Sequence, residues 1–205
     1  MCIMKILFTR HGRTAVNVRG RVHQVGDAAG LDRVGKRQIE KVARVFQQQK
    51  VEVIYSSPER RAVESAQIIG GKLNIKPIIE SGLAERNWGE WSQKTWEEVL
   101  AQLQTMSLEE RYSFIPPGGE SWEQAEIRLA DSVNEIIKRP HKVTAIITHG
   151  GVMRVLMPVL KNEPKESSFR YDFLNGSITS FEYKNGRWRL ISENDVSHLI
   201  GVDSG

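Results

Sequence analysis

The chain alternates short apolar runs with longer segments in which apolar and polar positions follow a helical period. Four short runs rich in β-branched residues predict strands at 5–9, 51–56, 76–79 and 143–148. Helical patterns follow three of these runs. Strands that alternate with helices predict an α/β fold, here a three-layer sandwich with a mostly parallel central sheet and helices on both faces.

The helices that follow these strands have recognisable patterns. Apolar residues within 39–46 recur at i, i+3, i+4 and i+7, which is typical of an amphipathic helix. Ser57 and Pro58 match an N-cap followed by proline at the first helical position, which predicts a helix to about Leu73. After the last strand, an apolar segment runs from 150 to 160 and completes the alternation.

The remaining segments are predicted from local signals. Ser121 and Gln124 form a capping-box pattern that opens another helix. Its apolar face contains Trp122, Ala125, Leu129, Val133, Ile136 and Ile137. Residues 83–119 are less regular, and the prolines and glycines at 116–119 mark a loop. Residues 184–186 separate two β-rich runs and predict the turn of a hairpin.

Composition limits the class of protein. Residues 1–205, with 40% hydrophobic and 26% charged side chains, are expected to form a single domain. No apolar run approaches the roughly 18 residues that a membrane span needs. Residues 6–8 are apolar, but Lys5 and Arg10 lie too close for a secretory signal, so we expect a cytoplasmic protein. The only cysteine, Cys2, has no expected role.

The net charge of +4 at pH 7 favours anionic ligands, but 29 basic against 25 acidic residues is a mild excess. The basic helical pattern at 36–44 is interrupted by Glu40 and lacks aromatic stacking groups, so we interpret it as a solvated face. We therefore expect a small phosphorylated metabolite as the partner, and neither nucleic acid nor a membrane. A homodimer stays open.

Ligands of such sheets bind beyond the carboxyl ends of the parallel strands. Three polar clusters are predicted to meet there: Thr9-Arg10-His11-Gly12, Ser56-Ser57 with Arg60 and Arg61, and Thr148-His149-Gly150-Gly151. Taken singly, each histidine or arginine is more commonly a solvated or locally hydrogen-bonded side chain. Their convergence on one rim of the sheet is what indicates a site.

These side chains suit phosphoryl transfer. A transferring phosphoryl group carries negative charge on three equatorial oxygens, which fixed cations and N–H donors must neutralise. Arginine offers a planar fork for those oxygens. A neutral imidazole can attack phosphorus in line if a hydrogen bond holds its other ring nitrogen. Glycine lets the backbone approach the phosphate, and the amides after Gly150 are expected to add donors.

Other chemistries find less support. Residues 30–36 mimic the start of a P-loop, but Arg37 replaces the Mg²⁺-binding hydroxyl and no strand precedes the segment, so we interpret it as a helix start. No His-Glu-x-x-His or Gly-x-Ser-x-Gly pattern occurs, so neither a metal, a cofactor nor a serine nucleophile is expected. His23, His141 and His198 are interpreted as surface or hydrogen-bonding side chains, although a tail carrying His198 can fold back over a site.

Several motifs, in order, resemble those of the histidine phosphatases, also called the phosphoglycerate mutase-like superfamily. The resemblance extends roughly from Ile6 to Leu199. The matching segments are Arg10-His11-Gly12-Arg13-Thr14 with Asn17, Ser56-Ser57-Pro58-Glu59-Arg60-Arg61-Ala62 with Ser65-Ala66, Leu83-Ala84-Glu85 with Gly89-Glu90-Trp91, Pro117-Gly118-Gly119-Glu120-Ser121, Thr148-His149-Gly150-Gly151, and Asn175-Gly176-Ser177-Ile178-Thr179 with Ser197-His198-Leu199. One Arg-His-Gly tripeptide is weak evidence, whereas this ordered set is specific.

By this resemblance the fold is phosphoglycerate mutase-like and the activity is that of a metal-independent phosphomonoesterase. His11 is implied to be the nucleophile. The groups implied to bind the phosphoryl oxygens are Arg10, Asn17, Arg61, His149 and Gly150. Glu85 is implied to protonate the leaving oxygen and then to take a proton from water, with Glu80 and Glu90 as rival carboxylates. Arg60 is expected to point elsewhere.

Residues 20–31 depart from the family pattern, because they contain one extra residue. In the family this loop usually lines the substrate entrance, so the resemblance leaves the substrate open among phosphoserine, sugar phosphates or bisphosphates, nucleotides and α-ribazole phosphate. Basic residues expected near the mouth, namely Arg13, Arg21 and Arg86, indicate a second anionic group on the substrate.

Two alternatives to a phosphatase are kept. A phosphoglycerate mutase needs the same pocket, but mutases of this family usually carry Trp directly before the Asn and a longer insertion after the loop that carries the acid, here Leu83-Ala84-Glu85. Val16 and the short segment 92–116 fit a phosphatase better. A non-catalytic phospholigand-binding protein would be expected to have lost a catalytic residue, and none is lost.

Overall fold

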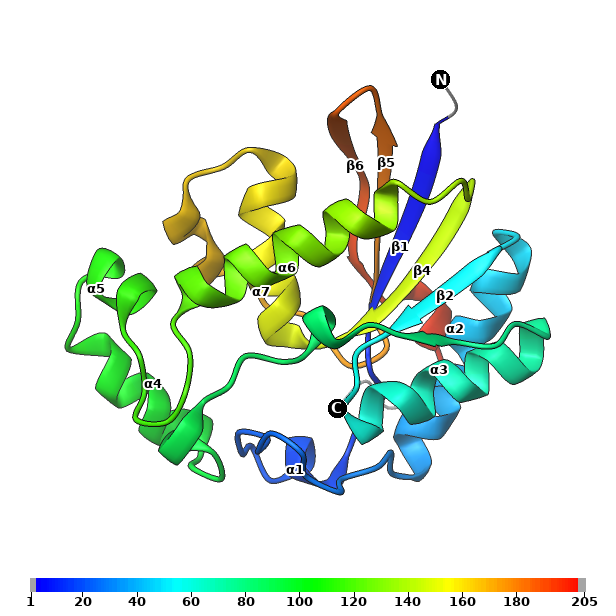
Figure 1. Cartoon of the computed structure of the whole chain (residues 1–205). Helices are drawn as coiled ribbons and strands as arrows, with labels where there is room; N and C mark the ends of the chain where they lie inside the picture. The colour runs from blue at the N-terminus through cyan, green and yellow to red at the C-terminus, as the bar shows by residue number, and fades with distance from the viewer. Residues whose placement is uncertain (1–2, 203–205) are drawn as a thin grey trace.

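The computed structural model describes residues 3–202, shown as a cartoon in Figure 1. Cys2, to which the sequence assigns no role, lies outside these residues. A six-stranded sheet has the order β3-β2-β4-β1-β5-β6. Its strands are β1 (Met4–Arg10), β2 (Val53–Ser56), β3 (Ile78–Ile79), β4 (Val143–Thr148), β5 (Ile178–Lys184) and β6 (Arg187–Asp195). Within residues 3–202, no helix combines the length and apolar character needed to cross a membrane.

The sheet is parallel over its first four strands and antiparallel at one edge. β3, β2, β4 and β1 pair in parallel, whereas β5 pairs antiparallel with β1 and β6 with β5. The predicted hairpin is confirmed: Asn185 and Gly186 join β5 to β6 with φ of 51° and 78°. Positive φ at both central residues is what a two-residue type I′ turn requires.

Helices cover both faces of the sheet, as the sequence predicted (Figure 1). The α-helices are α1 (Ala15–Val18), α2 (Arg33–Gln48), α3 (Arg60–Leu73), α4 (Trp96–Gln104), α5 (Leu108–Ser113), α6 (Trp122–Ile137) and α7 (Gly150–Lys161). Short 3-10 turns occur at η1 (Ser81–Leu83), η2 (Gly89–Trp91), η3 (Lys165–Arg170) and η4 (Ser197–Leu199). α6 and α7 lie over one face, and α2 and α3 over the other.

Alternation along β1 supplies both cores. Ile6 and Phe8 pack with the α6 and α7 side, whereas Leu7 packs with the α2 and α3 side. The apolar stripe predicted within 39–46 is confirmed as the buried face of α2. Burying one such side chain fully contributes about 1.5 to 3 kcal/mol. The sheet is therefore fixed between two apolar layers, and its strand ends are held in place.

The start of α3 corrects a prediction. The helix begins at Arg60 with Glu59 at the N-cap, and Ser57 does not cap it. The hydroxyl of Ser57 instead contacts Glu59 and His149, so it is engaged in the site and not at a helix end. The capping box of Ser121 is confirmed at the start of α6.

Residues 83–119 are more helical than expected. They contain α4 and α5, and each helix begins with a capping box, formed by Thr95 with Glu98 and by Ser107 with Glu110. These two patterns are visible in the sequence and mark helix starts that the irregular apolar spacing concealed. The segment also builds a small third core from Val22, Trp88, Trp91, Val99 and Leu103. It projects beyond the carboxyl ends of the strands (Figure 1).

Candidate active site

The three polar clusters meet at the carboxyl ends of the parallel strands, as predicted. β1 and β4 are neighbours with Arg10 paired to Thr148, so His11 and His149 follow at the same level. Their ring centroids are 5.2 Å apart. Arg61 enters from the first turn of α3, the helix that follows β2. All three of these side chains at the strand ends are at most 2% exposed.

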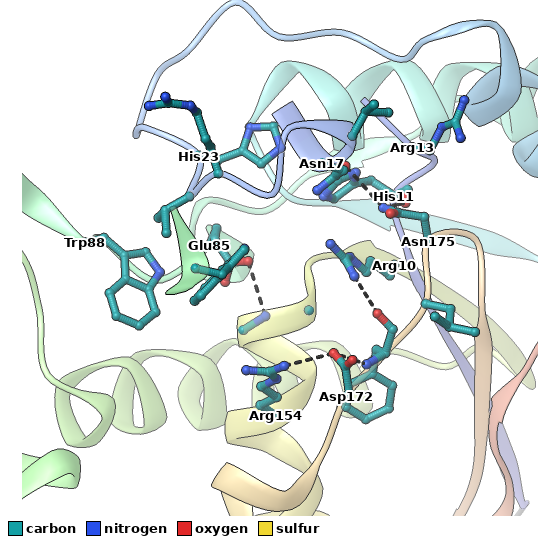
Figure 2. A pocket seen from close by; sticks show the side chains of 18 of the residues that line it. Arg10, His11, Arg13, Asn17, His23, Glu85, Trp88, Arg154, Asp172 and Asn175 are labelled. Carbon is teal, nitrogen blue, oxygen red and sulfur yellow. Dashed lines mark hydrogen bonds and ion pairs between the residues drawn. The ribbon is translucent and has the colours of Figure 1, made fainter. Parts of the chain in front are cut away.

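A cavity of about 570 Å³ opens over these strand ends. Figure 2 shows its lining, which contains five of the predicted site residues, namely Arg10, His11, Asn17, Glu85 and Gly150. Arg61 and His149 are fully buried and are not among the residues that line the cavity, but within residues 3–202 each keeps at least one nitrogen without a hydrogen-bond partner. Five of the seven predicted site residues therefore line one cavity, and the other two are buried.

His11 is held in one tautomer. Its Nδ1 lies 2.8 Å from the carbonyl oxygen of Gly12. Because a carbonyl oxygen only accepts, Nδ1 carries the hydrogen and Nε2 keeps its lone pair. Burial, followed by the charge of Arg61 and by His149, holds the pKa of His11 well below its ordinary value. The ring is therefore neutral at physiological pH, as a nucleophile must be.

Two buried guanidinium groups face this ring with unused donors. Nη1 of Arg10 donates to the carbonyl of Phe173 at 2.5 Å, and burial lowers the pKa of Arg10 to about 10. Within residues 3–202, Nε of Arg10 and both Nε and Nη1 of Arg61 have no hydrogen-bond acceptor. A buried donor without an acceptor is destabilising, and a bound anion would satisfy it. Arg60 is exposed, which confirms that it points elsewhere.

His149 is held from the opposite ring nitrogen. Its Nε2 lies 2.9 Å from Oε2 of Glu59 and 2.6 Å from the hydroxyl of Ser57. Burial alone would raise the pKa of Glu59, but hydrogen bonds from His149 and Ser57 lower it to about 2. An ionised carboxylate only accepts, so Nε2 carries the hydrogen. Nδ1 is buried and has no partner among the described residues. Glu59 was assigned no role from the sequence, although it lies inside the matching segment Ser56-Ser57-Pro58-Glu59-Arg60-Arg61-Ala62.

Glu85 is fixed at the rim by two backbone amides. The N–H of Arg86 donates to Oε1 at 2.9 Å, and the N–H of Gly151 donates to Oε2 at 3.2 Å. A Cβ at position 151 would come within 2.3 Å of Oε1, so only glycine allows this approach. The expectation that the amides after Gly150 face a phosphate is thus wrong for Gly151. The rival carboxylates Glu80 and Glu90 are not among the residues that line the cavity.

Two asparagines complete the wall near His11. Oδ1 of Asn17 accepts from the backbone N–H and the hydroxyl of Thr14, at 3.1 and 2.9 Å. Its Nδ2 is therefore the end that can donate to an oxyanion. Asn175 belongs to the matching segment Asn175-Gly176-Ser177-Ile178-Thr179. It donates from Nδ2 to the carbonyl of His11 at 3.0 Å. It positions the strand end that carries the histidine.

The unusual loop at 20–31 reaches into the site. His23 lines the cavity with its ring centroid 5.8 Å from that of His11. Its Nδ1 is paired with Oδ2 of Asp27 at 2.8 Å, and Oδ1 of Asp27 lies 3.6 Å from Nη1 of Arg61. Burial is the main reason why the pKa of His23 falls to about 4. The interpretation of His23 as a surface residue is wrong, whereas its hydrogen-bonding role is confirmed.

The arginines expected at the mouth behave differently from one another. Arg13 and Arg21 line the cavity, but Arg13 is paired with Asp32 and Arg21 donates to the carbonyl of Gln93. Arg86 is only 1% exposed, so its expected place at the mouth is wrong. Its guanidinium stacks on Trp88 and Trp122, with Cζ 4.0 and 5.1 Å from the ring centroids. Those two aromatic faces and its backbone acceptors bury it.

Two further charges at the cavity were missed by the sequence analysis. Arg154 on α7 and Asp172 both line it and form an ion pair of 2.8 Å. His141 and His198 do not line it, and His198 contacts the carbonyl of Gly176 at 3.0 Å. Among residues 3–202, no group of three or more His, Cys, Asp or Glu side chains is arranged to hold a metal ion.

Fold and site together define an α/β protein with a buried cationic pocket at the carboxyl ends of its parallel strands, an arrangement suited to a phosphoryl group. The chain belongs to the histidine phosphatase superfamily (branch 1), whose model matches residues 6–196. The family predicted from the ordered motifs is thereby confirmed.

Similar proteins agree with this assignment. A metal-independent phosphoserine phosphatase of Arabidopsis thaliana is 31% identical, covering 98% of this chain and 85% of the relative. Phosphoglycerate mutase-like protein 4 of the same plant is 29% identical, covering 95% and 86%. The structure of a mycobacterial glucosyl-3-phosphoglycerate phosphatase complexed with VO3 matches with a TM-score of 0.82 at 26% identity, covering 93% of this chain and 98% of that one. The phosphoglycerate mutase-like fold is confirmed.

Proposed function

We propose that this protein is a phosphatase that hydrolyses small phosphomonoesters through a phosphohistidine at His11. The observation that carries the proposal is the fixed tautomer of His11, which leaves the lone pair on Nε2. Burial and then the charge of Arg61 lower the pKa of this ring, and within residues 3–202 both Arg61 and Arg10 keep buried donors without acceptors. Relatives named as phosphatases support the same reaction. The expected partner is a small phosphorylated metabolite.

The reaction proceeds in two steps that share one phosphoryl position. Nε2 of His11 attacks phosphorus, the ester P–O bond breaks, and Glu85 gives its proton to the leaving oxygen. Arg10, Arg61 and the amide of Asn17 hold the equatorial oxygens, and Gly150 leaves room for them. Glu85 then takes a proton from water, the hydroxide attacks phosphorus, and the P–N bond breaks to release phosphate.

His149 supplies a switchable charge in this scheme. Its pKa is lowered by burial and by Arg61, so the ring is neutral at physiological pH. A phosphoryl dianion beside Nδ1 would favour protonation there, because Glu59 already holds the opposite nitrogen. The ring then donates to a phosphoryl oxygen.

The test is hydrolysis of p-nitrophenyl phosphate by purified protein in the presence of EDTA. Turnover with formation of an acid-labile phosphoenzyme is expected, and His11→Ala should abolish both. Equal activity of wild type and His11→Ala would remove the nucleophile from the scheme. Supplying 3-phosphoglycerate and measuring both phosphate release and isomer formation separates a phosphatase from a mutase.

A further inference from the structure

An ion pair lies on the cavity wall beyond the groups assigned to the phosphate. Nη2 of Arg154 is 2.8 Å from Oδ1 of Asp172, and both residues line the cavity. The side chains are 29% and 75% exposed, so both remain accessible from solvent. Figure 2 shows the pair below Glu85 and Arg10. The proposed phosphatase chemistry makes no use of these charges.

The pair is close to the phosphate position. Asp172 directly precedes Phe173, whose carbonyl anchors Arg10. Asp172 raises and Arg154 lowers the pKa of Arg10, although burial is the larger influence, so both charges act on that guanidinium. Arg154 follows Gly151 by three residues on α7, about 5 Å or one turn along the helix. A substrate held at Arg10 therefore presents its next few atoms to the pair.

Both members retain capacity for a ligand. A guanidinium has five N–H donors, and within residues 3–202 only Nη2 of Arg154 donates to a protein acceptor. Oδ1 of Asp172 accepts from Arg154 and from the N–H of Phe173 at 3.0 Å, which leaves Oδ2 to accept from a ligand. Arg13 and Arg21 also line the cavity, but the acceptors to which they donate lie outside its lining.

The rest of the wall would direct a charged group to this pair. Much of the remaining lining is apolar and is formed by Val18, Val22, Trp88, Trp96, Leu100 and Trp122. Such side chains offer no compensation for a desolvated charge. A carboxylate or an ammonium group on a bound substrate is therefore expected at Arg154 and Asp172.

We propose that Arg154 and Asp172 recognise the α-carboxylate and α-ammonium groups of a phosphorylated hydroxy amino acid, with O-phosphoserine as the simplest case. In that molecule one methylene separates the ester oxygen from the carbon that bears both charges. Opposite charges side by side on the protein complement a zwitterion, whereas a substrate with only a carboxylate would be repelled by Asp172. This inference rests on the proposed function, because it takes the phosphate end to be bound at Arg10.

The experiment compares three phosphomonoesters that carry different charged groups beside the phosphate. O-phosphoserine carries both, 3-phosphoglycerate carries the carboxylate alone, and p-nitrophenyl phosphate carries neither. Arg154→Gln should lower kcat/KM for the first two at least about tenfold more than for the third. Asp172→Asn should lower kcat/KM at least about tenfold for O-phosphoserine, and should leave 3-phosphoglycerate equal or faster.

Arg189→Gln is the matched control, because Arg189 forms an exposed ion pair with Glu182 away from the cavity. It should change none of the three rates. Equal losses on all substrates, or an Asp172→Asn variant that treats O-phosphoserine and 3-phosphoglycerate alike, would overturn the zwitterion site. If wild type hydrolyses none of the three, the proposed function is wrong. Calorimetric binding of O-phosphoserine against 3-phosphoglycerate, with the same variants, then decides the inference alone.

Discussion

His11 and His149 occupy equivalent places at the ends of neighbouring parallel strands, and each is followed by glycine. Both rings are buried, and they stand 5.2 Å apart. They differ in what holds them. A neutral carbonyl holds Nδ1 of His11, whereas an ionised carboxylate, Glu59, holds Nε2 of His149. In the proposed reaction the same side chain therefore serves as the nucleophile in one turn and as a donor to the phosphoryl group in the other.

The largest effect should come from deleting each ring in turn. His11→Ala removes the group that bonds to phosphorus, so a loss of more than about 10⁴-fold in kcat is expected. His149→Ala removes one stabilising donor, for which about 10² to 10³-fold is expected. Quenched samples analysed by mass spectrometry should contain a phosphohistidine in His149→Ala only. Similar losses of kcat, with no phosphoenzyme in either variant, would contradict different roles for the two rings.

Substitution of Gly12, which follows His11, should lower stability, whereas substitution of Gly151, two residues after His149, should lower activity. A Cβ at Gly12 would lie 2.5 Å from the backbone oxygen of Gly35, and backbone cannot move aside cheaply. Gly12→Ala should destabilise the fold by about 2 to 3 kcal/mol in urea unfolding. A Cβ at Gly151 would meet only the carboxylate of Glu85, which can rotate.

Gly151→Ala should therefore keep its stability and lose about ten- to a hundredfold in kcat on an alkyl phosphate. The loss should be smaller on p-nitrophenyl phosphate, whose leaving group needs less protonation. Gly71→Ala in α3, where an added Cβ meets nothing within 4 Å, is the control. Unfolding of Gly151→Ala at a much lower urea concentration would contradict this view.

The lowered pKa of both histidine rings should make the folded state less stable in acid. Burial lowers the pKa of both rings, so the unfolded chain binds protons that the folded chain rejects. The stabilisation is present in full above about pH 6.5 and decreases as the pH falls toward the folded-state pKa values. For His11 the expected slope is about 1.4 kcal/mol per pH unit below pH 6. The difference between the urea midpoints at pH 7 and pH 5 should be smaller in His11→Asn than in His149→Asn. Equal midpoints of the wild type at the two pH values would refute the expectation.

The smallest effect on kcat should come from substituting Glu59, the hydrogen-bond partner of His149. Glu59→Gln keeps an acceptor for Nε2 of His149 but removes the charge that favours its protonation. We expect kcat to fall about tenfold, which corresponds to about 1.4 kcal/mol in the transition state. The phosphoenzyme should still form on His11. Glu40→Gln, on the exposed side of α2, should leave kcat unchanged.

The sequence predicted those parts of the site that follow from short patterns within single strands. A run of β-branched residues followed by His-Gly is readable in one strand, and parallel pairing then brings two such ends together. Partners that depend on the final course of a side chain were not readable. Ser57 was predicted to cap a helix, but it hydrogen-bonds to His149. Arg86 was predicted at the mouth of the cavity, but its guanidinium stacks on two tryptophans.

Charges beyond the motifs were also out of reach. Arg154 belongs to an apolar helix and Asp172 to an irregular segment, and nothing in the sequence indicates that they meet. Asp27 reaches Arg61 only because the loop at 20–31 turns inward. Two missed helices, α4 and α5, did have readable capping boxes. The unpredicted part of the site therefore consists mainly of long-range ion pairs, which leave no periodic trace.

The pairing of β1 with β4 also bears on how the chain acquires its native state. β1 is the first strand and β4 begins only at Val143, yet the two pair directly in the middle of the sheet. Closing so long a loop is entropically unfavourable and slow compared with forming local helices. During refolding, recovery of helical circular dichroism should precede recovery of enzymatic turnover, since neither histidine turn has its neighbour until that loop has closed.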